Sequence, residues 1–172
     1  MKEFLKKYKF WIIAFAVFAV GLILDLVLKA VFFEQEFDLI NGFISIYYTF
    51  NTGAAWSIFA NQTIFLIVVS VIILIALTIF CLFYKSSSTF YAISVGLIFG
   101  GAIGNLIDRI LFGGVRDFIR LEFWPTFPIF NIADICLCVG AVMLCVFFLF
   151  FSSKLEKRTK KIQNETDKET QD

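Results

Sequence analysis

Histidine is entirely absent from this chain of 172 residues. Its absence excludes nucleophilic catalysis by a serine–histidine or cysteine–histidine pair, and it also excludes the helical zinc motif that carries two histidines. Four cysteines are present, but all lie in apolar runs and none forms a C-x-x-C pair, so neither disulfide exchange nor a zinc site is expected. We therefore expect no metal or other cofactor, and any chemistry must rest on carboxylates, amides and hydroxyls.

Charged residues are also scarce, at 17% of the chain, and the formal net charge is only +1. So small a net charge gives no reason to expect a nucleic-acid partner. Hydrophobic residues make up 60% of the chain, and its mean hydropathy is +0.87. A soluble domain of this size cannot bury so much apolar surface, whereas a lipid bilayer accommodates it. The composition therefore predicts an integral membrane protein.

Four apolar segments are long enough to cross a bilayer, whose hydrocarbon core takes about 20 residues of helix. We expect transmembrane helices over residues of about 10–33, 63–84, 86–110 and 131–153. Together they predict a single membrane domain over residues 1–153. The tail, residues 154–172, is dominated by Lys, Glu and Asp and is expected to be a disordered cytoplasmic segment.

Lysine and arginine are unevenly distributed around these helices. They are frequent before the first helix and after the fourth, and Lys85 lies between the second and the third. The loop 34–62 has neither residue type, and the loop after the third helix has only Arg116 and Arg120. By the positive-inside rule, both termini face the cytoplasm and these two loops face outward.

The two outer loops differ in their sequence patterns. Within the first loop, residues 43–48 alternate in the manner of short strands, and the aromatic side chains there suit a membrane interface. The second loop, 112–130, opens with Gly113 and Gly114 and contains two prolines, so we expect it to be irregular. The predicted fold class is an all-α membrane protein with a small β-rich extracytoplasmic element between helices one and two.

Polar residues from three helices are expected at one level of the membrane. Asp25 lies roughly 22 Å along the first helix from Phe10, at about 1.5 Å per residue, and therefore in its outer part. Lys29 lies one turn further out on the same helix. Asn105, Asp108 and Arg109 lie at the outer end of the third helix, and Asn131 and Asp134 lie at the start of the fourth. Asp117 follows in the adjoining loop. Because ionisable groups inside a bilayer are unfavourable, this convergence predicts a functional site.

Each of these polar residues also has a purely structural interpretation. Lys29 and Arg109 could extend to the membrane interface, and Asp25 could form a simple ion pair with Lys29 four residues later. Asn131 could cap the fourth helix, with Asp134 in its first turn. These interpretations leave the cluster at the end of the third helix unexplained.

A pair of close aspartates would supply acid and base chemistry. Two neighbouring carboxyl groups cannot both be comfortably ionised, so the pKa of one of them rises. The protonated member then acts as an acid, while the ionised member activates water. The candidates are Asp25, Asp108, Asp117 and Asp134. Arg109 beside Asp108, and Lys29 near Asp25, favour structural ion pairs there, which leaves Asp117 and Asp134 as the better catalytic pair.

Four motifs together resemble a known family. They are Asn51-Thr52-Gly53-Ala54-Ala55-Trp56-Ser57, Gly100-Gly101-Ala102-Ile103-Gly104-Asn105-Leu106-Ile107-Asp108-Arg109, Val115-Arg116-Asp117-Phe118, and Phe127-Pro128-Ile129-Phe130-Asn131-Ile132-Ala133-Asp134. In this order they resemble bacterial lipoprotein signal peptidase (signal peptidase II). The resemblance implies an aspartyl protease of the bacterial cytoplasmic (inner) membrane. Such an enzyme removes signal peptides from prolipoproteins, cutting just before a cysteine that carries diacylglycerol.

The resemblance also implies roles for individual residues. The family's catalytic aspartates fall on Asp117 and Asp134, and the first outer loop corresponds to its interfacial β-cradle. Trp56 falls on the flap that covers the bound peptide. The family's supporting polar residues fall on Asp25, Lys29, Asn51, Asn105, Asp108, Arg109 and Asn131. The implied partners are prolipoprotein signal peptides with a diacylglyceryl cysteine, membrane lipid and globomycin-type inhibitors, and we expect a monomer.

Three other classes of membrane protein were weighed against this interpretation. A small ion-coupled membrane transporter would also bury carboxylates, but such proteins usually show inverted repeats and binding sites at the bilayer midplane. A quinone-linked thiol oxidoreductase would need an outward cysteine pair, for which Cys136 and Cys138 are poor candidates. A purely structural assembly subunit is compatible with the spacing.

Overall fold

The computed structural model describes residues 2–54, 56 and 58–151, with side chains from Tyr8 onward. The elements in chain order are α1 (Lys2–Val31), β1 (Glu36–Ile40), β2 (Ile44–Asn51), α2 (Thr63–Phe83), α3 (Thr89–Phe112), β3 (Val115–Leu121), α4 (Ile132–Val146) and a short π-helix, η2 (Phe147–Phe151). Four helices within these residues are long and apolar enough to cross a membrane, which agrees with the prediction. The tail predicted to be disordered, 154–172, lies outside the described residues.

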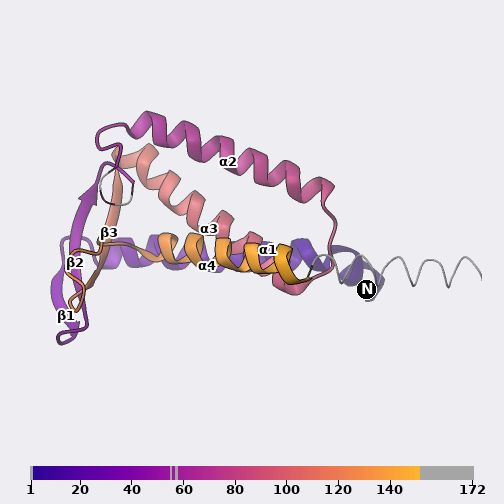
Figure 1. Cartoon of the computed structure of the whole chain (residues 1–172), viewed down its shortest axis with the longest axis horizontal. Helices are drawn as coiled ribbons and strands as arrows, with labels where there is room; N and C mark the ends of the chain where they lie inside the picture. Colours follow the sequence, from indigo (N-terminus) through magenta and orange to yellow (C-terminus); the bar gives the residue numbers. More distant parts are fainter. Residues whose placement is uncertain (1, 55, 57, 152–172) are drawn as a thin grey trace, which may run out of the picture.

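Helix α3 is the centre of the bundle, and α1 and α4 pack against it (Figure 1). Glycines allow this approach, because a side chain at these positions would collide with a neighbouring backbone. A Cβ atom on Gly96 would lie 2.5 Å from the carbonyl oxygen of Ala14 in α1. One on Gly101 would overlap the carbonyl oxygen of Ala133 in α4. The first turn of α4 is thereby brought against the polar end of α3.

Helix α2 lies at the edge of the bundle and packs mainly on α3 (Figure 1). At its start, the Thr63 hydroxyl donates a hydrogen bond of 2.6 Å to the carbonyl oxygen of Gly113. At its end, Phe80 makes an edge contact with Phe148, with ring centroids 5.6 Å apart. Most of its large apolar side chains are exposed, as expected for a helix that faces lipid.

An antiparallel sheet in the order β1-β2-β3 stands across one end of the helix bundle, away from the N-terminus (Figure 1). Strands β1 and β2 come from the loop where short strands were predicted. The third strand does not, because β3 lies within the segment 112–130 that was expected to be irregular. That expectation was wrong. The glycines and prolines lie before and after the strand, and its charged residues obscure the apolar alternation that identifies a strand.

The contact between α3 and α4 generates a prediction about stability. We expect Gly101→Ala to lower the free energy of unfolding by roughly 1–3 kcal/mol, because the added methyl group must push the α4 backbone away. Thermal unfolding in detergent micelles measures the change. Gly21→Ala is the matched control, since a Cβ there would lie 3.4 Å from the Cys136 sulfur, an ordinary contact. Equal stability of both variants would contradict the tight packing.

Candidate active site

Asp117 lies in the middle of β3 and is only 2% exposed. Its two carboxyl oxygens accept hydrogen bonds from two different amides. Oδ1 accepts from Asn131 Nδ2 at 2.7 Å, and Oδ2 accepts from Asn51 Nδ2 at 3.0 Å. Asn51 itself is held by the turn that follows β2, because its Oδ1 accepts from the backbone N–H of Gly53 at 2.9 Å. The carboxyl group is therefore fixed from two sides.

Asp134 lies in the first turn of α4, where it forms a reciprocal capping box with Asn131. The Asn131 side chain accepts from the backbone N–H of Asp134 at 3.0 Å, and Asp134 Oδ2 accepts from the backbone N–H of Asn131 at 3.1 Å. The capping interpretation of Asn131 is thus confirmed. The same asparagine also donates to Asp117, so one residue joins the two aspartates.

Lys29 lies fully buried beneath this pair. Its ammonium group is 2.7 Å from Asp25 Oδ2 and 3.6 Å from Asp108 Oδ2, and it donates to Asn105 Oδ1 at 3.0 Å. The predicted ion pair with Asp25 is confirmed, whereas the interpretation that Lys29 extends to the interface is wrong. Its charge stays inside because two carboxylates and an amide oxygen replace its water.

Asn105 connects this buried charge to Asp134. Its Oδ1 accepts from Lys29 and also from Asn131 Nδ2 at 3.1 Å, while its Nδ2 donates to Asp134 Oδ1 at 2.8 Å. Asp25 belongs to the same hydrogen-bond network, because its Oδ1 accepts from the backbone N–H of Ala133 at 2.8 Å. Residues from α1, α3 and α4 thus meet at one level, as the sequence predicted.

Asp108 pairs with Arg116 as well as with Lys29, and the expectation that Arg109 neutralises it was wrong. Arg116 Nη2 lies 2.8 Å from Asp108 Oδ1, and the Arg116 backbone N–H donates to Oδ2 at 3.0 Å. Consecutive residues on a helix point in different directions, so Arg109 cannot face Asp108. Arg109 instead donates to the carbonyl oxygen of Gly53 at 3.1 Å.

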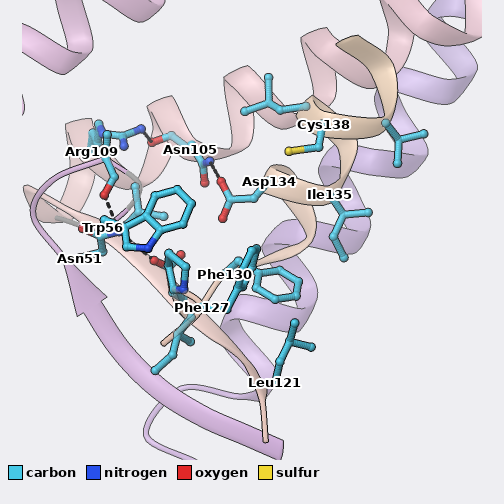
Figure 2. Close-up of a pocket in the computed structure, with 17 residues that line it drawn as sticks. Asn51, Trp56, Asn105, Arg109, Leu121, Phe127, Phe130, Asp134, Ile135 and Cys138 are labelled. Carbon is cyan, nitrogen blue, oxygen red and sulfur yellow. Dashed lines mark hydrogen bonds between the residues drawn. The ribbon is translucent and has the colours of Figure 1, made fainter. Parts of the chain in front are cut away.

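An apolar cavity of about 530 Å³ opens beside the two aspartates. Both line it, together with Asn51, Asn105 and Arg109. Most of the remaining wall is apolar and comes from residues 127–130, 135 and 137–139. In Figure 2 the carboxyl group of Asp134 and the rings of Trp56, Phe127 and Phe130 surround the same space. The polar groups therefore lie at one end of a pocket that suits an apolar ligand.

Trp56 lies on the rim of this cavity and is 65% exposed. Its backbone φ of 52° lies in the left-handed region, which is uncommon for a residue with a large side chain. Its only described ring contact is with Phe127, in an edge geometry with centroids 6.1 Å apart. Few interactions hold the indole in place, so the residue is well placed to cover a ligand in the cavity.

The sequence of this chain matches a known protein family. The family model described as "Signal peptidase (SPase) II" matches residues 17–150 of the chain. The chain belongs to the signal peptidase II family. This membership favours the peptidase interpretation over the transporter interpretation, and it makes the chain a multi-pass protein of the bacterial inner membrane.

Individual relatives in the signal peptidase II family agree over most of their length. The lipoprotein signal peptidase of Clostridium acetobutylicum is 34% identical over 145 residues, which cover 80% of this chain and 94% of the relative. That of Staphylococcus aureus (strain JH9) is 41% identical over 128 residues, 73% and 78% of the two chains. A solved bacterial membrane enzyme, determined by the in meso method at 2.3 Å resolution, has a TM-score of 0.76 at 34% identity and covers 82% of this chain and 90% of its own.

In this member of the signal peptidase II family, the carboxyl group of Asp117 has a raised pKa. Burial and, as a second cause, the nearby charge of Asp134 together raise it from 3.8 to about 7. The amides of Asn51 and Asn131 act against this rise in pKa, because they donate to the charged form. A substantial fraction of Asp117 therefore remains protonated at neutral pH. Among the described residues, no group of three acidic, cysteine or histidine side chains could hold a metal ion.

Arg116 is the site residue that the sequence reasoning missed. It stacks its guanidinium over the ring of Phe112 at 4.6 Å, besides pairing with Asp108. The available signal was the glycine pair at 113–114, since a tight turn there lets the strand fold back along the end of α3. From the sequence, Arg116 contributed only to the charge count of the second outer loop and to one family motif.

The buried ion pair of this family member generates a second prediction. We expect Lys29→Met to destabilise the protein by about 3–5 kcal/mol, because Asp25 and Asp108 then share the interior without the ammonium group. Denaturant unfolding in micelles measures the loss. Adding Asp25→Asn to Lys29→Met should recover part of it. Lys9→Met, at an exposed position of the same helix, is the control and should unfold like the unaltered protein.

Proposed function

We propose that this chain is an aspartic endopeptidase that removes signal peptides from prolipoproteins, cutting before a cysteine that carries diacylglycerol. The observation that carries the proposal is the pair Asp117 and Asp134, joined through Asn131 at the wall of an apolar cavity. The site lies at the end of four membrane-spanning helices, where an apolar peptide in the bilayer meets water. Family membership supports a peptidase, and the carboxyl groups supply the only paired acid and base in the cavity wall.

The cavity suits the apolar part of such a substrate. A signal peptide is an apolar helix, so it reaches the protease by lateral diffusion through the bilayer. The cavity is lined by residues 135 and 137–139 of α4, several of which are exposed on the face that we expect to meet lipid. We place the substrate there, with the bond to be cut beside the two carboxyl groups and Trp56 over it. A globomycin-type inhibitor would occupy the same space.

The proposed chemistry begins with a water molecule between the two carboxyl groups. Asp134, in its ionised form, takes a proton from the water molecule. At the same time the water oxygen attacks the carbonyl carbon of the residue before the cysteine. Asp117 gives its proton to the carbonyl oxygen, so no charge accumulates there. Asp134 then returns the proton to the cysteine nitrogen as the C–N bond breaks. Asp117 regains its proton from the hydroxyl that becomes the new carboxyl group.

Neighbouring residues position these groups. Asn105 and the backbone N–H of Asn131 donate to Asp134 and hold its carboxyl group in place. Arg109 lines the cavity and donates a hydrogen bond to the carbonyl oxygen of Gly53. It therefore links the flap to the cavity wall and places a positive charge there. We assign Arg109 to binding the substrate carbonyl or holding the flap. These residues act on the substrate or through the aspartates without exchanging protons themselves.

The proposed orientation follows the positive-inside rule. Lysine-rich termini remain in the cytoplasm, and the sheet end of the bundle faces outward. The aspartates then meet a translocated lipoprotein on the outer face of the cytoplasmic membrane. We propose that a monomer suffices, because both aspartates of the cavity come from one chain.

Substitution of the two aspartates tests the proposed function. Asp117→Asn and Asp134→Asn should each reduce cleavage of a diacylglyceryl-modified precursor by roughly 10³-fold or more, because neither amide can exchange the proton. A gel-shift assay with purified enzyme in micelles measures cleavage, with and without globomycin. Asp38→Asn, at an exposed position of β1, is the matched control. Normal cleavage by either active-site variant would refute the assignment.

The pKa of Asp117 leads to a prediction about pH. Because its proton is required and its pKa lies at about 7, kcat/KM should fall above neutral pH by about tenfold for each further pH unit. Asn51→Ala removes a hydrogen bond that favours the ionised form, so the decline should begin at a higher pH. A pH series with the lipid-modified precursor measures both effects. A rate that stays constant to about pH 9 would show that Asp117 is not the acid.

A further inference from the structure

A second and smaller cavity, of about 280 Å³, lies beside the first. It is lined by residues 49–52, at the end of β2 and in the turn after it, by Trp56 and Asp117, and by residues 128–129. None of these lining residues belongs to one of the four membrane-spanning helices that the structure describes. The larger cavity, in contrast, extends along α4.

Asp117 lines both cavities, whereas Asp134 lines only the larger one. Asn51 and Trp56 are also shared. The smaller cavity therefore begins at the reacting carboxyl group and leads away from the membrane helices. A peptide whose bond lies beside Asp117 would have one side in the apolar cavity and its other side directed toward the smaller cavity.

Thr49 gives the smaller cavity a polar group next to Asp117. A bulge in β2 between Ile46 and Thr49 shifts the register, so that Thr49 lies directly opposite Asp117. Opposite residues of an antiparallel pair point to the same face of the sheet. The Thr52 hydroxyl is engaged with Asn61, but the Thr49 hydroxyl forms no hydrogen bond with another described residue. It is therefore available to a ligand.

We propose that the smaller cavity binds the mature part of the lipoprotein, beginning with the residue after the lipidated cysteine, and that Thr49 contacts this residue. The inference rests on the proposed function and assigns a binding site to the product side of the cut. The acyl chains of the cysteine belong with the apolar cavity and the bilayer, whereas the chain that follows is hydrophilic and leaves the membrane. The volume is several times the roughly 30 Å³ of a water molecule, so it accommodates a short piece of peptide.

The proposal predicts a preference for a small polar residue after the cysteine. Its hydroxyl or amide would pair with Thr49, whereas a large apolar side chain would cover Thr49 and Asp117 without replacing their water. The test compares kcat/KM for two diacylglyceryl-modified precursor peptides that differ only in this residue, serine or leucine. The unaltered enzyme should cleave the serine peptide faster.

Thr49→Val keeps the shape of the side chain but removes the hydroxyl. We expect kcat/KM for the serine peptide to fall about 2- to 10-fold, as for one lost hydrogen bond, while the leucine peptide is cleaved as well as before or better. Thr49→Ser should restore the preference, which separates a contact with substrate from a change in folding. Thr78→Val, the same change on the exposed face of α2, should leave both rates unaltered.

Two results would overturn the proposal while the proposed function stands. If Thr49→Val slows both peptides equally, the cavity supplies water or supports Asp117 and does not bind the mature chain. If neither rate changes in the variant, Thr49 does not contact this residue. Failure of the unaltered enzyme to cleave either peptide would refute the proposed function itself.

Discussion

The site depends on the ammonium group of Lys29, which is fully buried between two carboxylates and an amide oxygen. It occupies one lone pair of Asn105 Oδ1, and the Asn131 amide occupies another. With its oxygen engaged, the Asn105 amide can only present its hydrogens to Asp134. A charge on α1 thus determines the direction of a hydrogen bond at the start of α4. Removing it would leave Asp25 Oδ2 without its counter-charge and Asn105 Oδ1 with the Asn131 amide alone among the described residues.

The aspartates gain different properties from the same neighbour. Asn131 serves Asp134 through its backbone N–H, as a helix cap does, and serves Asp117 through its side-chain amide. Asp117 is enclosed between strand and helices, and its burial, together with the nearby charge of Asp134, raises its pKa to about 7. Asp134 lies in the first turn of α4, where its carboxyl group belongs to the helix cap. The two carboxyl groups therefore have different environments, because one lies on a strand and the other at the start of a helix.

The depth in the membrane at which the polar residues meet was predictable. The thickness of the bilayer determines the length of a spanning helix, and the position of a residue along that helix then gives its depth. The four spans followed from this alone, the Asp25–Lys29 pair followed from their i, i+4 spacing, and the family motifs pointed to Asp117 and Asp134. Strand β3 was not predictable, since its charged residues find partners in other elements, such as Asp108 of α3 for Arg116 and Ser45 of β2 for Arg120. The pairing of Asp108 with Arg116 was also missed, because the turn after α3 decides it and helical spacing does not.

The hydrogen bond between the backbone of Ala133 and Asp25 joins the last spanning helix to the first. Asp117 pairs with a strand made earlier, but Asn131 and Asp134 arrive only with α4. During synthesis the proposed pair of aspartates therefore cannot form until the final helix has entered the membrane. A truncated chain lacking that helix would keep Asp117 but would lack Asp134 and the bridging Asn131. Premature termination thus yields a fragment without the paired carboxyl groups.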